Sequence, residues 1–145
     1  KSINLYGEAL LKSIGKEKNN VHSTAAAADY LSAYWHKTLG IPRAELGILD
    51  GCGLSPDNRV SAQAMTQIMR YAKSQPWYAE FYKSLPTINQ MKMKSGTIGG
   101  VLGYAGYQRA ADGQELSFTL FVNNYKGSAA QMRQRMFKLL NVLKQ

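Results

Sequence analysis

Residues 91–123 read MKMKSGTIGGVLGYAGYQRAADGQELSFTLFVN, and this stretch decides the fold. Its composition and apolar spacing are those of strands in three segments, 91–98, 101–109 and 115–123. Gly99-Gly100 and Asp112-Gly113 separate the segments, and Asp-Gly is a strong signal for a hairpin turn. The stretch therefore predicts an antiparallel three-stranded meander.

The residues on both sides of this stretch have helical spacing instead. Four helices are predicted before it: one from near Leu5 that is ended by Gly15 and the polar run 16–20, one from Ala25 to Leu39, one after Ser61, and one around Trp77 to Tyr82. One amphipathic helix is predicted after it, over residues 129–144. This order of elements predicts the α+β class, and we expect residues 1–145 to form a single domain.

The segment between the second and third predicted helices, residues 47–58, is expected to be irregular because it contains three glycines and one proline. Its apolar residues Ile48, Leu49 and Leu54 suggest that it packs against the body of the protein. Cys52, the one cysteine, permits no internal disulfide and is interpreted as a small packed residue. With two scattered histidines besides, we expect neither a metal nor a cofactor.

The formal net charge is +9, which allows nucleic-acid binding as one interpretation. The basic residues are spread along the chain without interleaved aromatic residues, so we favour a solvated basic face and no nucleic-acid partner. No apolar run approaches the ~20 residues of a membrane span. The first residues, Lys1-Ser2-Ile3-Asn4, are not a signal peptide, and we expect that an upstream segment is missing.

Lys94, Ser95, Gly96 and Thr97 on the first predicted strand have the chemistry of a carboxylate site. The ammonium group attracts an anion, the hydroxyl groups can bind it, and glycine allows close approach to the backbone. Opposite charges in contact attract by about 4 kcal/mol at an effective dielectric constant near 20. Taken alone, these residues also fit an exposed strand surface, and Ser2 and Asn4 also fit helix caps.

Lys94-Ser95-Gly96-Thr97 and the strands after it resemble the third motif region of the class C penicillin-binding proteins. Three earlier segments resemble the same family in the family's order: Ser2-Ile3-Asn4 its Ser-x-Asn motif, residues 50–55 (DGCGLS) its Asp-Gly-Ser-Gly-Leu-Ser segment, and Ser84-Leu85-Pro86 its Ser-Leu-Pro. The resemblance covers nearly the whole chain. It implies the C-terminal portion of a transpeptidase-like catalytic domain with a serine β-lactamase-like fold.

The resemblance also implies roles for these residues. Ser2 would relay a proton, and Asn4 would bind the substrate amide and orient a catalytic lysine. Lys94, Ser95 and Thr97 would bind the terminal carboxylate of the substrate, with Gly96 between them. The parent would be a periplasmic or otherwise extracytoplasmic serine D-alanyl-D-alanine carboxypeptidase, which acts on peptidoglycan stem peptides by acylation and deacylation and is inhibited by β-lactams.

The nucleophilic Ser-x-x-Lys of that family precedes Ser-x-Asn, and its place lies before residue 2 here. Ser13-Ile14-Gly15-Lys16 matches the pattern but follows Ser-x-Asn, so we interpret Ser13 and Lys16 as surface residues. The chain alone is therefore expected to be inactive and to need the missing N-terminal part of the same protein. A non-catalytic cell-wall or anionic-ligand binding module is the alternative.

Two departures from the family pattern stand out. Ser95 replaces the threonine of Lys-Thr-Gly, which keeps the hydroxyl group. The stretch from Pro86 to Lys94 is short, and this leaves the preference between carboxypeptidase and endopeptidase activity open.

Overall fold

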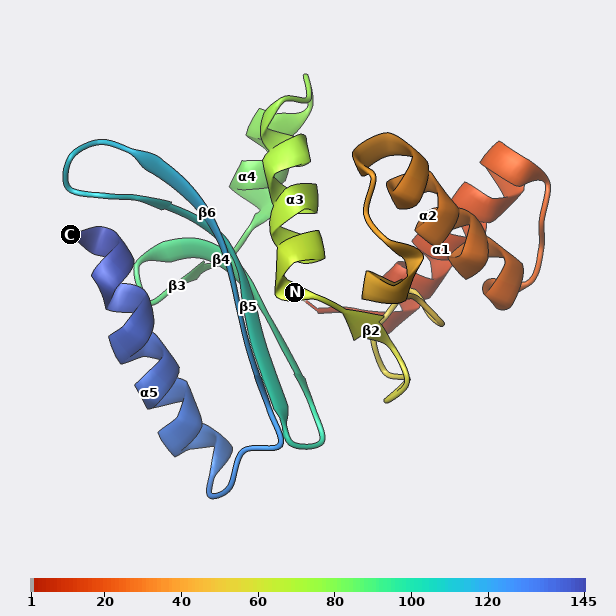
Figure 1. Ribbon diagram of the computed structural model, residues 1–145. Coiled ribbons are helices and arrows are strands. Elements are labelled where there is room, and N and C mark those ends of the chain that lie inside the picture. Colours follow the sequence, from red (N-terminus) through yellow and green to blue (C-terminus); the bar gives the residue numbers. More distant parts are fainter. Residues whose placement is uncertain (1) are drawn as a thin grey trace. The chain divides into compact units, whose positions relative to one another are not determined.

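The structure, a computed structural model, describes residues 2–145 except for the side chain of Asn19. The chain forms two compact units, which meet in the sequence between Ala64 and Met65. Helices precede and follow antiparallel strands, which confirms the α+β class (Figure 1). That residues 1–145 act as a single domain stays a prediction.

The first unit is built on two helices, α1 (Asn4–Asn19) and α2 (Thr24–Leu39). The helix predicted from Ala25 to Leu39 is confirmed with one additional residue at its start. The N-cap is Ser23, whose hydroxyl oxygen accepts the Ala26 N–H at 3.1 Å, and the helix ends before Gly40, which has φ of 68°. Leu11 of α1 packs on Ala27 and Ala28 of α2, and all three are buried. A short 3₁₀ helix (Arg43–Glu45) and two paired strands, β1 (Leu46–Gly47) and β2 (Arg59–Val60), follow.

The helix α1 ends at Asn19, within the polar run 16–20 that was predicted to end it, but the role predicted for Gly15 in ending the helix is wrong. Gly15 lies at the contact between the two helices, where an added Cβ would come within 2.6 Å of the Ala27 Cβ. The glycine therefore allows close helix packing and does not end the helix. The end comes at Asn20, which has φ of 49° and a left-handed conformation.

The loop between β1 and β2 covers residues 48–58 and is called the β1–β2 loop below. Ile48 packs against the cluster around Leu11, as expected. Leu49 and Leu54 are 49% and 60% exposed, so the expectation that they pack against the body is wrong. Beyond Ile48, the loop is held mainly by polar contacts and not by burial of apolar side chains.

The second unit contains most of α3 (Ala62–Lys73), all of α4 (Tyr78–Ser84) and a four-stranded antiparallel sheet in the order β3-β4-β5-β6. Strands β4 (Met91–Ile98), β5 (Val101–Arg109) and β6 (Glu115–Asn123) confirm the predicted meander with the predicted bounds. The short strand β3 (Thr87–Ile88) was not predicted. It pairs with β4 through a turn at Asn89 and Gln90, both at positive φ, and this turn has no glycine to signal it.

The sheet buries a different set of residues on each face. Met91, Met93, Leu102 and Tyr104 pack against Met136 and Leu140 of α5 (Ala129–Leu140), which ends in a 3₁₀ turn (Asn141–Lys144). On the other face, Tyr107 packs with Met69 of α3 and with the end of α4. Figure 1 shows α5 on one face and α3 and α4 on the other. In the described part of the chain, none of the helices has the length and hydropathy needed to cross a bilayer.

Candidate active site

Ser2 and Asn4 lie at the N-terminal end of α1. The N-cap residue is Ile3, and its carbonyl oxygen accepts the N–H groups of Tyr6 and Gly7 at 3.1 and 3.3 Å. No side chain caps this helix, so the interpretation of Ser2 and Asn4 as helix caps is wrong. Both side chains are exposed and make no hydrogen bond to residues 2–145, which leaves their polar groups available.

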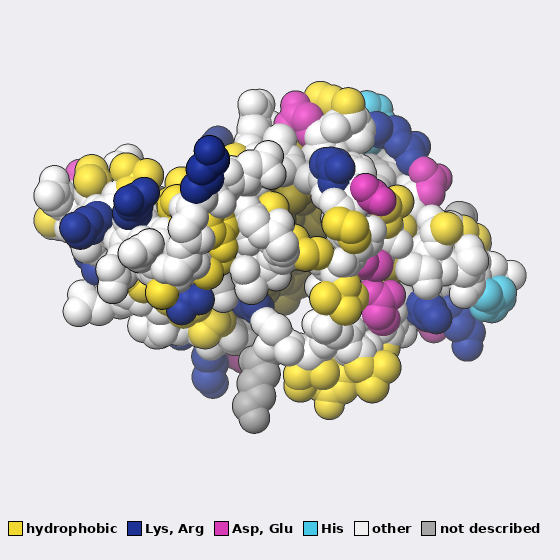
Figure 2. All heavy atoms as spheres, turned by 90° about the horizontal axis from the view of Figure 1, so that it is seen from below, with side chains coloured by type: hydrophobic (Ala, Val, Ile, Leu, Met, Phe, Trp, Pro, Cys, Tyr) yellow, Lys and Arg dark blue, Asp and Glu magenta, His cyan; other side chains and the backbone are white. Residues whose placement is uncertain are grey.

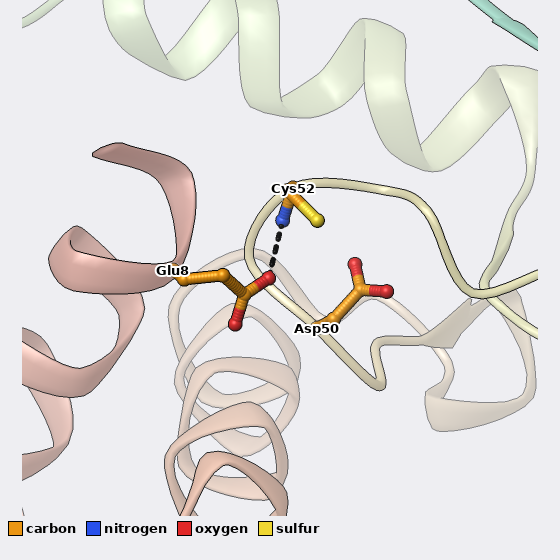
Figure 3. Close-up of side chains that lie close together, drawn as sticks. All are labelled: Glu8, Asp50 and Cys52. Carbon is orange, nitrogen blue, oxygen red and sulfur yellow. Dashed lines mark hydrogen bonds between the residues drawn. The ribbon is translucent and has the colours of Figure 1, made fainter. Parts of the chain in front are cut away.

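The first half of α1 is fastened to the β1–β2 loop. Glu8 Oε1 accepts the N–H groups of Gly51 and Cys52, each at 2.9 Å. Figure 3 shows the bond from Cys52. Gly7 and Gly51 bring their backbones together, since a Cβ on Gly51 would lie 2.2 Å from the Gly7 carbonyl oxygen. Sequence reasoning missed this contact, because its partners are more than forty residues apart.

Asp50 holds the β1–β2 loop in shape. Its Oδ1 accepts the Gly53 N–H at 2.6 Å and the Asn58 side-chain amide at 3.0 Å, and its Oδ2 accepts the Ser55 N–H at 2.6 Å. Burial alone would raise the pKa of Asp50, but the hydrogen bonds from Ser55, Gly53 and Asn58 together lower it. The loop is therefore built around a carboxylate that remains ionised.

Glu8, Asp50 and Cys52 form a cluster whose ligand atoms lie within 4.8 Å of one another (Figure 3). The Glu8 oxygen and both Asp50 oxygens already accept N–H groups of the loop, so the cluster is accounted for as the anchor of that loop. The hydrogen bond with the Glu8 side chain raises the pKa of the Cys52 thiol. A thiol that keeps its proton is a poor nucleophile, which supports the structural interpretation of Cys52.

The second group of predicted residues, Lys94 to Thr97, lies on β4. One edge of β4 pairs with β5, with Lys94 opposite Ala105 and Thr97 opposite Leu102. The other edge pairs with the short β3 only as far as Lys92, and beyond Met93 no strand of the described chain joins it. The predicted site is therefore an open strand edge.

The backbone groups at this open edge can be assigned from the pairing. The Met93 N–H points away from β5 and donates to the Pro86 carbonyl at 3.1 Å. Because alternate residues of a strand point the same way, the N–H groups of Ser95 and Thr97 also point to the open edge. A ligand lying along β4 would meet these two donors.

The side chains at this edge leave the sheet on both faces. Lys94 shares a face with Ala105, while Ser95 and Thr97 share the opposite face with Tyr104 and Leu102. Lys94 and Thr97 are exposed; the Lys94 ammonium donates to the Ser95 carbonyl at 2.5 Å, and the Thr97 hydroxyl donates to the Val101 carbonyl at 3.2 Å. A Cβ at Gly96 would meet nothing within 4 Å, so there is free space beside the strand.

A cavity of about 280 Å³ in the second unit is separate from this edge. Tyr78, Tyr82 and Tyr107 form one wall, and the ion pair between Lys73 and Glu115, 3.2 Å apart, stands beside them. Burial raises the pKa of both Tyr78 and Tyr107, and the Tyr107 hydroxyl donates to the Met69 carbonyl at 2.7 Å. None of the sequence-predicted site residues lines the cavity.

The surface positions agree with two further predictions. Ser13 and Lys16 are exposed on α1, which confirms their interpretation as surface residues. Lysine and arginine side chains stand in several separate groups on the face drawn in Figure 2, as their spread along the sequence predicts.

The model of the D-Ala-D-Ala carboxypeptidase 3 (S13) family matches residues 1–143. The chain belongs to this family. A curated D-alanyl-D-alanine carboxypeptidase from Actinomadura sp. (strain R39) is 29% identical over 153 residues, which cover 88% of this chain and 27% of that protein. The S13 chain therefore spans about a quarter of this relative.

Solved structures share the fold. Penicillin binding protein 4 from Haemophilus influenzae matches with a TM-score of 0.86 and 20% identity, over 100% of this chain and 38% of that one. The same protein in complex with a β-lactam matches with a TM-score of 0.83, 21% identity and the same full coverage of this chain, over 39% of that one. A predatory endopeptidase from Bdellovibrio bacteriovorus, in complex with an immunity protein, matches with a TM-score of 0.60 and 17% identity over 94% and 43% of the two chains. These matches confirm the transpeptidase-like fold.

The predicted site residues of this S13 chain fall in two separate groups. Ser2 and Asn4 belong to the first unit, and Lys94 to Thr97 belong to the second. That the two groups meet around one ligand stays a prediction. Glu8 lies close to the first group, and the sequence analysis gave it no role. Its spacing of one helical turn from Asn4 could have pointed to it.

Proposed function

We propose that this chain is the C-terminal portion of a serine-type D-Ala-D-Ala carboxypeptidase that acts on peptidoglycan stem peptides outside the cytoplasmic membrane. Membership of the S13 family supports the activity, and the open edge of β4 supports the site. The observation that carries the proposal is the row of outward N–H groups at Ser95 and Thr97 beside the exposed Lys94.

The open edge suits a peptide that ends in a carboxylate. An extended peptide would add to β4 as an extra strand, through main-chain hydrogen bonds. The Lys94 ammonium and the hydroxyl groups of Ser95 and Thr97 would then bind the terminal carboxylate. The Thr97 N–H would donate to the carbonyl oxygen as negative charge develops on it, and one such donor lowers the barrier by about 3 kcal/mol.

Ser2 and Asn4 complete the proposed site from the N-terminal end of α1. The Asn4 amide would bind the substrate amide and orient the catalytic lysine, and the Ser2 hydroxyl would pass a proton to the leaving amine. Both side chains are exposed and unbonded within residues 2–145, as these roles require. The acyl group would be carried by a serine outside this chain.

An apolar stripe on α1 supports the proposal that more S13 polypeptide packs there. Ile3, Tyr6, Leu10 and Ile14 follow helical spacing and are 36–65% exposed. The relatives matched by this chain are more than twice its length. We expect the stripe to contact the part of the enzyme that carries Ser-x-x-Lys.

Labelling with a fluorescent penicillin tests the proposal. The full-length protein should be labelled at a serine outside residues 1–145, and the 145-residue chain alone should not be labelled. Lys94→Ala in the full-length protein should lower the acylation rate, while Lys126→Ala, a lysine outside the proposed site, should not. Labelling at Ser13, or a full-length protein that binds stem peptide without being acylated, would contradict it, and the second result would favour a non-catalytic binding module.

A further inference from the structure

We infer that Glu8 is a positioning residue, which fixes the direction of the N-terminal turn of α1 and thereby the place of Ser2 and Asn4; this rests on the proposed function. Glu8 follows Asn4 by four residues, so the two side chains stand one above the other on the same side of the helix. A contact that fixes the position of Glu8 therefore also fixes the helix turn that carries Asn4.

Glu8 is held at a defined point of the β1–β2 loop. One oxygen, Oε1, accepts two neighbouring N–H groups, those of Gly51 and Cys52, at 2.9 Å each. Hydrogen bonds to a carboxylate are about twice as strong as those between neutral groups. The loop itself is kept in shape by Asp50, so the anchor does not move freely.

The neighbouring residue, Gly7, adds a steric constraint at the same place. An added Cβ on Gly7 would lie 2.6 Å from the Gly51 carbonyl oxygen, so the two backbones are in direct contact. The carboxylate of Glu8 draws the loop toward α1, and the contact at Gly7 sets how close it comes. Together they define one orientation of the helix end.

The residues before Gly7 have little else to hold them. Ser2, Ile3, Asn4 and Leu5 are all exposed, and the first buried residue of α1 is Leu11. Without the Glu8 contacts, the first turn would be free to fray, since exposed helix ends open most easily. The Asn4 side chain would then no longer have one fixed position relative to the substrate.

The first test compares three variants of the full-length protein in acylation by a β-lactam. Glu8→Ala should lower the acylation rate constant by about 10- to 100-fold, since small displacements of catalytic groups have effects of this order, with the binding constant nearly unchanged. Glu8→Gln keeps an oxygen acceptor and should remain within about 3-fold of the wild type. Ser23→Ala is the matched control, because it removes the cap of α2 without touching α1.

Equal rates for Glu8→Ala and wild type would overturn the inference. So would a Ser23→Ala variant that loses as much activity as Glu8→Ala, because the effect would then be one of stability only. Failure of the wild type to acylate would count against the proposed function, and the second test would still decide the role of Glu8.

The second test needs no activity and uses the 145-residue chain. Amide hydrogen exchange should become faster in Glu8→Ala at Gly51 and Cys52 and at Tyr6 and Gly7, whose N–H groups bond to the Ile3 carbonyl. Glu8→Gln should keep most of this protection. Unchanged exchange at Tyr6 and Gly7 in Glu8→Ala would show that Glu8 does not position the first turn.

Discussion

Asp50 shows how one ionised residue can replace an apolar core in a loop. Both of its carboxylate oxygens accept backbone N–H groups, and Oδ1 also accepts the Asn58 amide. The pKa of Asp50 is lowered in the folded protein because these hydrogen bonds favour the ionised form. The ionised carboxylate therefore stabilises the fold, while the protonated one does not.

The pH dependence of stability follows from this shift. The ordinary pKa of aspartate is about 4, so the contribution of Asp50 is complete above that pH and is lost as the pH falls through its lower folded-state pKa. Asp50→Asn should lower the free energy of unfolding near neutral pH, and its difference from the wild type should shrink in acid. Urea unfolding measured from about pH 6 to about pH 2 checks this.

Asp57→Asn is the control on the same loop. Asp57 is exposed and contacts Arg59 only at 3.7 Å, so its replacement should have little effect at any pH. A difference between wild type and Asp50→Asn that stays constant down to the lowest pH would contradict the role given to Asp50.

Among the elements, the strands were predicted most completely. Glycine-containing turns separate β4 from β5 and β5 from β6, so a local pattern was enough to define the three strands. Strand β3 was missed because Asn89 and Gln90 adopt positive φ without glycine. The role of Gly15 in α1 was predicted wrongly because this glycine serves a contact with Ala27, and a contact across two helices leaves no local signal.

The packing of α1 on α2 can be tested at Gly15. Gly15→Ala would raise helix propensity by about 1 kcal/mol, but the new methyl group would overlap Ala27, and overpacking of this kind costs about 1–3 kcal/mol. We expect a net loss of stability, measured as a lower midpoint of thermal unfolding. Ser13 is exposed on the same helix, so Ser13→Ala raises helix propensity without creating an overlap. This variant should not lower the midpoint of thermal unfolding.

The sequence predicted the two groups of residues in the candidate site, but not the contact that holds the first group. Lys94 to Thr97 and Ser2 with Asn4 were found as motifs, because their chemistry is concentrated in a few adjacent residues. The contact of Glu8 with Gly51 could not be found in that way. It joins residues 43 positions apart through backbone N–H groups, which every residue type except proline provides.

At the scale of the whole molecule, the chain has an apolar helix face that is not buried within the first unit. Leu10 on the α1 stripe is 65% exposed, whereas Leu11 beside it is 3% exposed. A stripe of this kind on a part of a larger family fold is expected to lie at an interface.

The two neighbouring leucines provide the test. Leu10→Lys should change the unfolding free energy of the 145-residue chain by less than about 0.5 kcal/mol, because the side chain is already in solvent. In the full-length protein the same change should be strongly destabilising, since it would place a charge in a buried contact. Leu11→Lys should destabilise both proteins, and equal small effects of Leu10→Lys in both would argue against an interface on α1.

The open edge of β4 has a consequence beyond ligand binding. An unpaired strand edge is a template on which another copy of the chain can assemble, and natural proteins often protect such edges from aggregation with lysine. Lys94 is exposed on this strand, so a register that paired two copies of β4 near Lys94 would place like charges close together, and their repulsion would oppose the pairing. The residue proposed to attract a substrate carboxylate would thus also oppose edge-to-edge association of the chain when no ligand is bound.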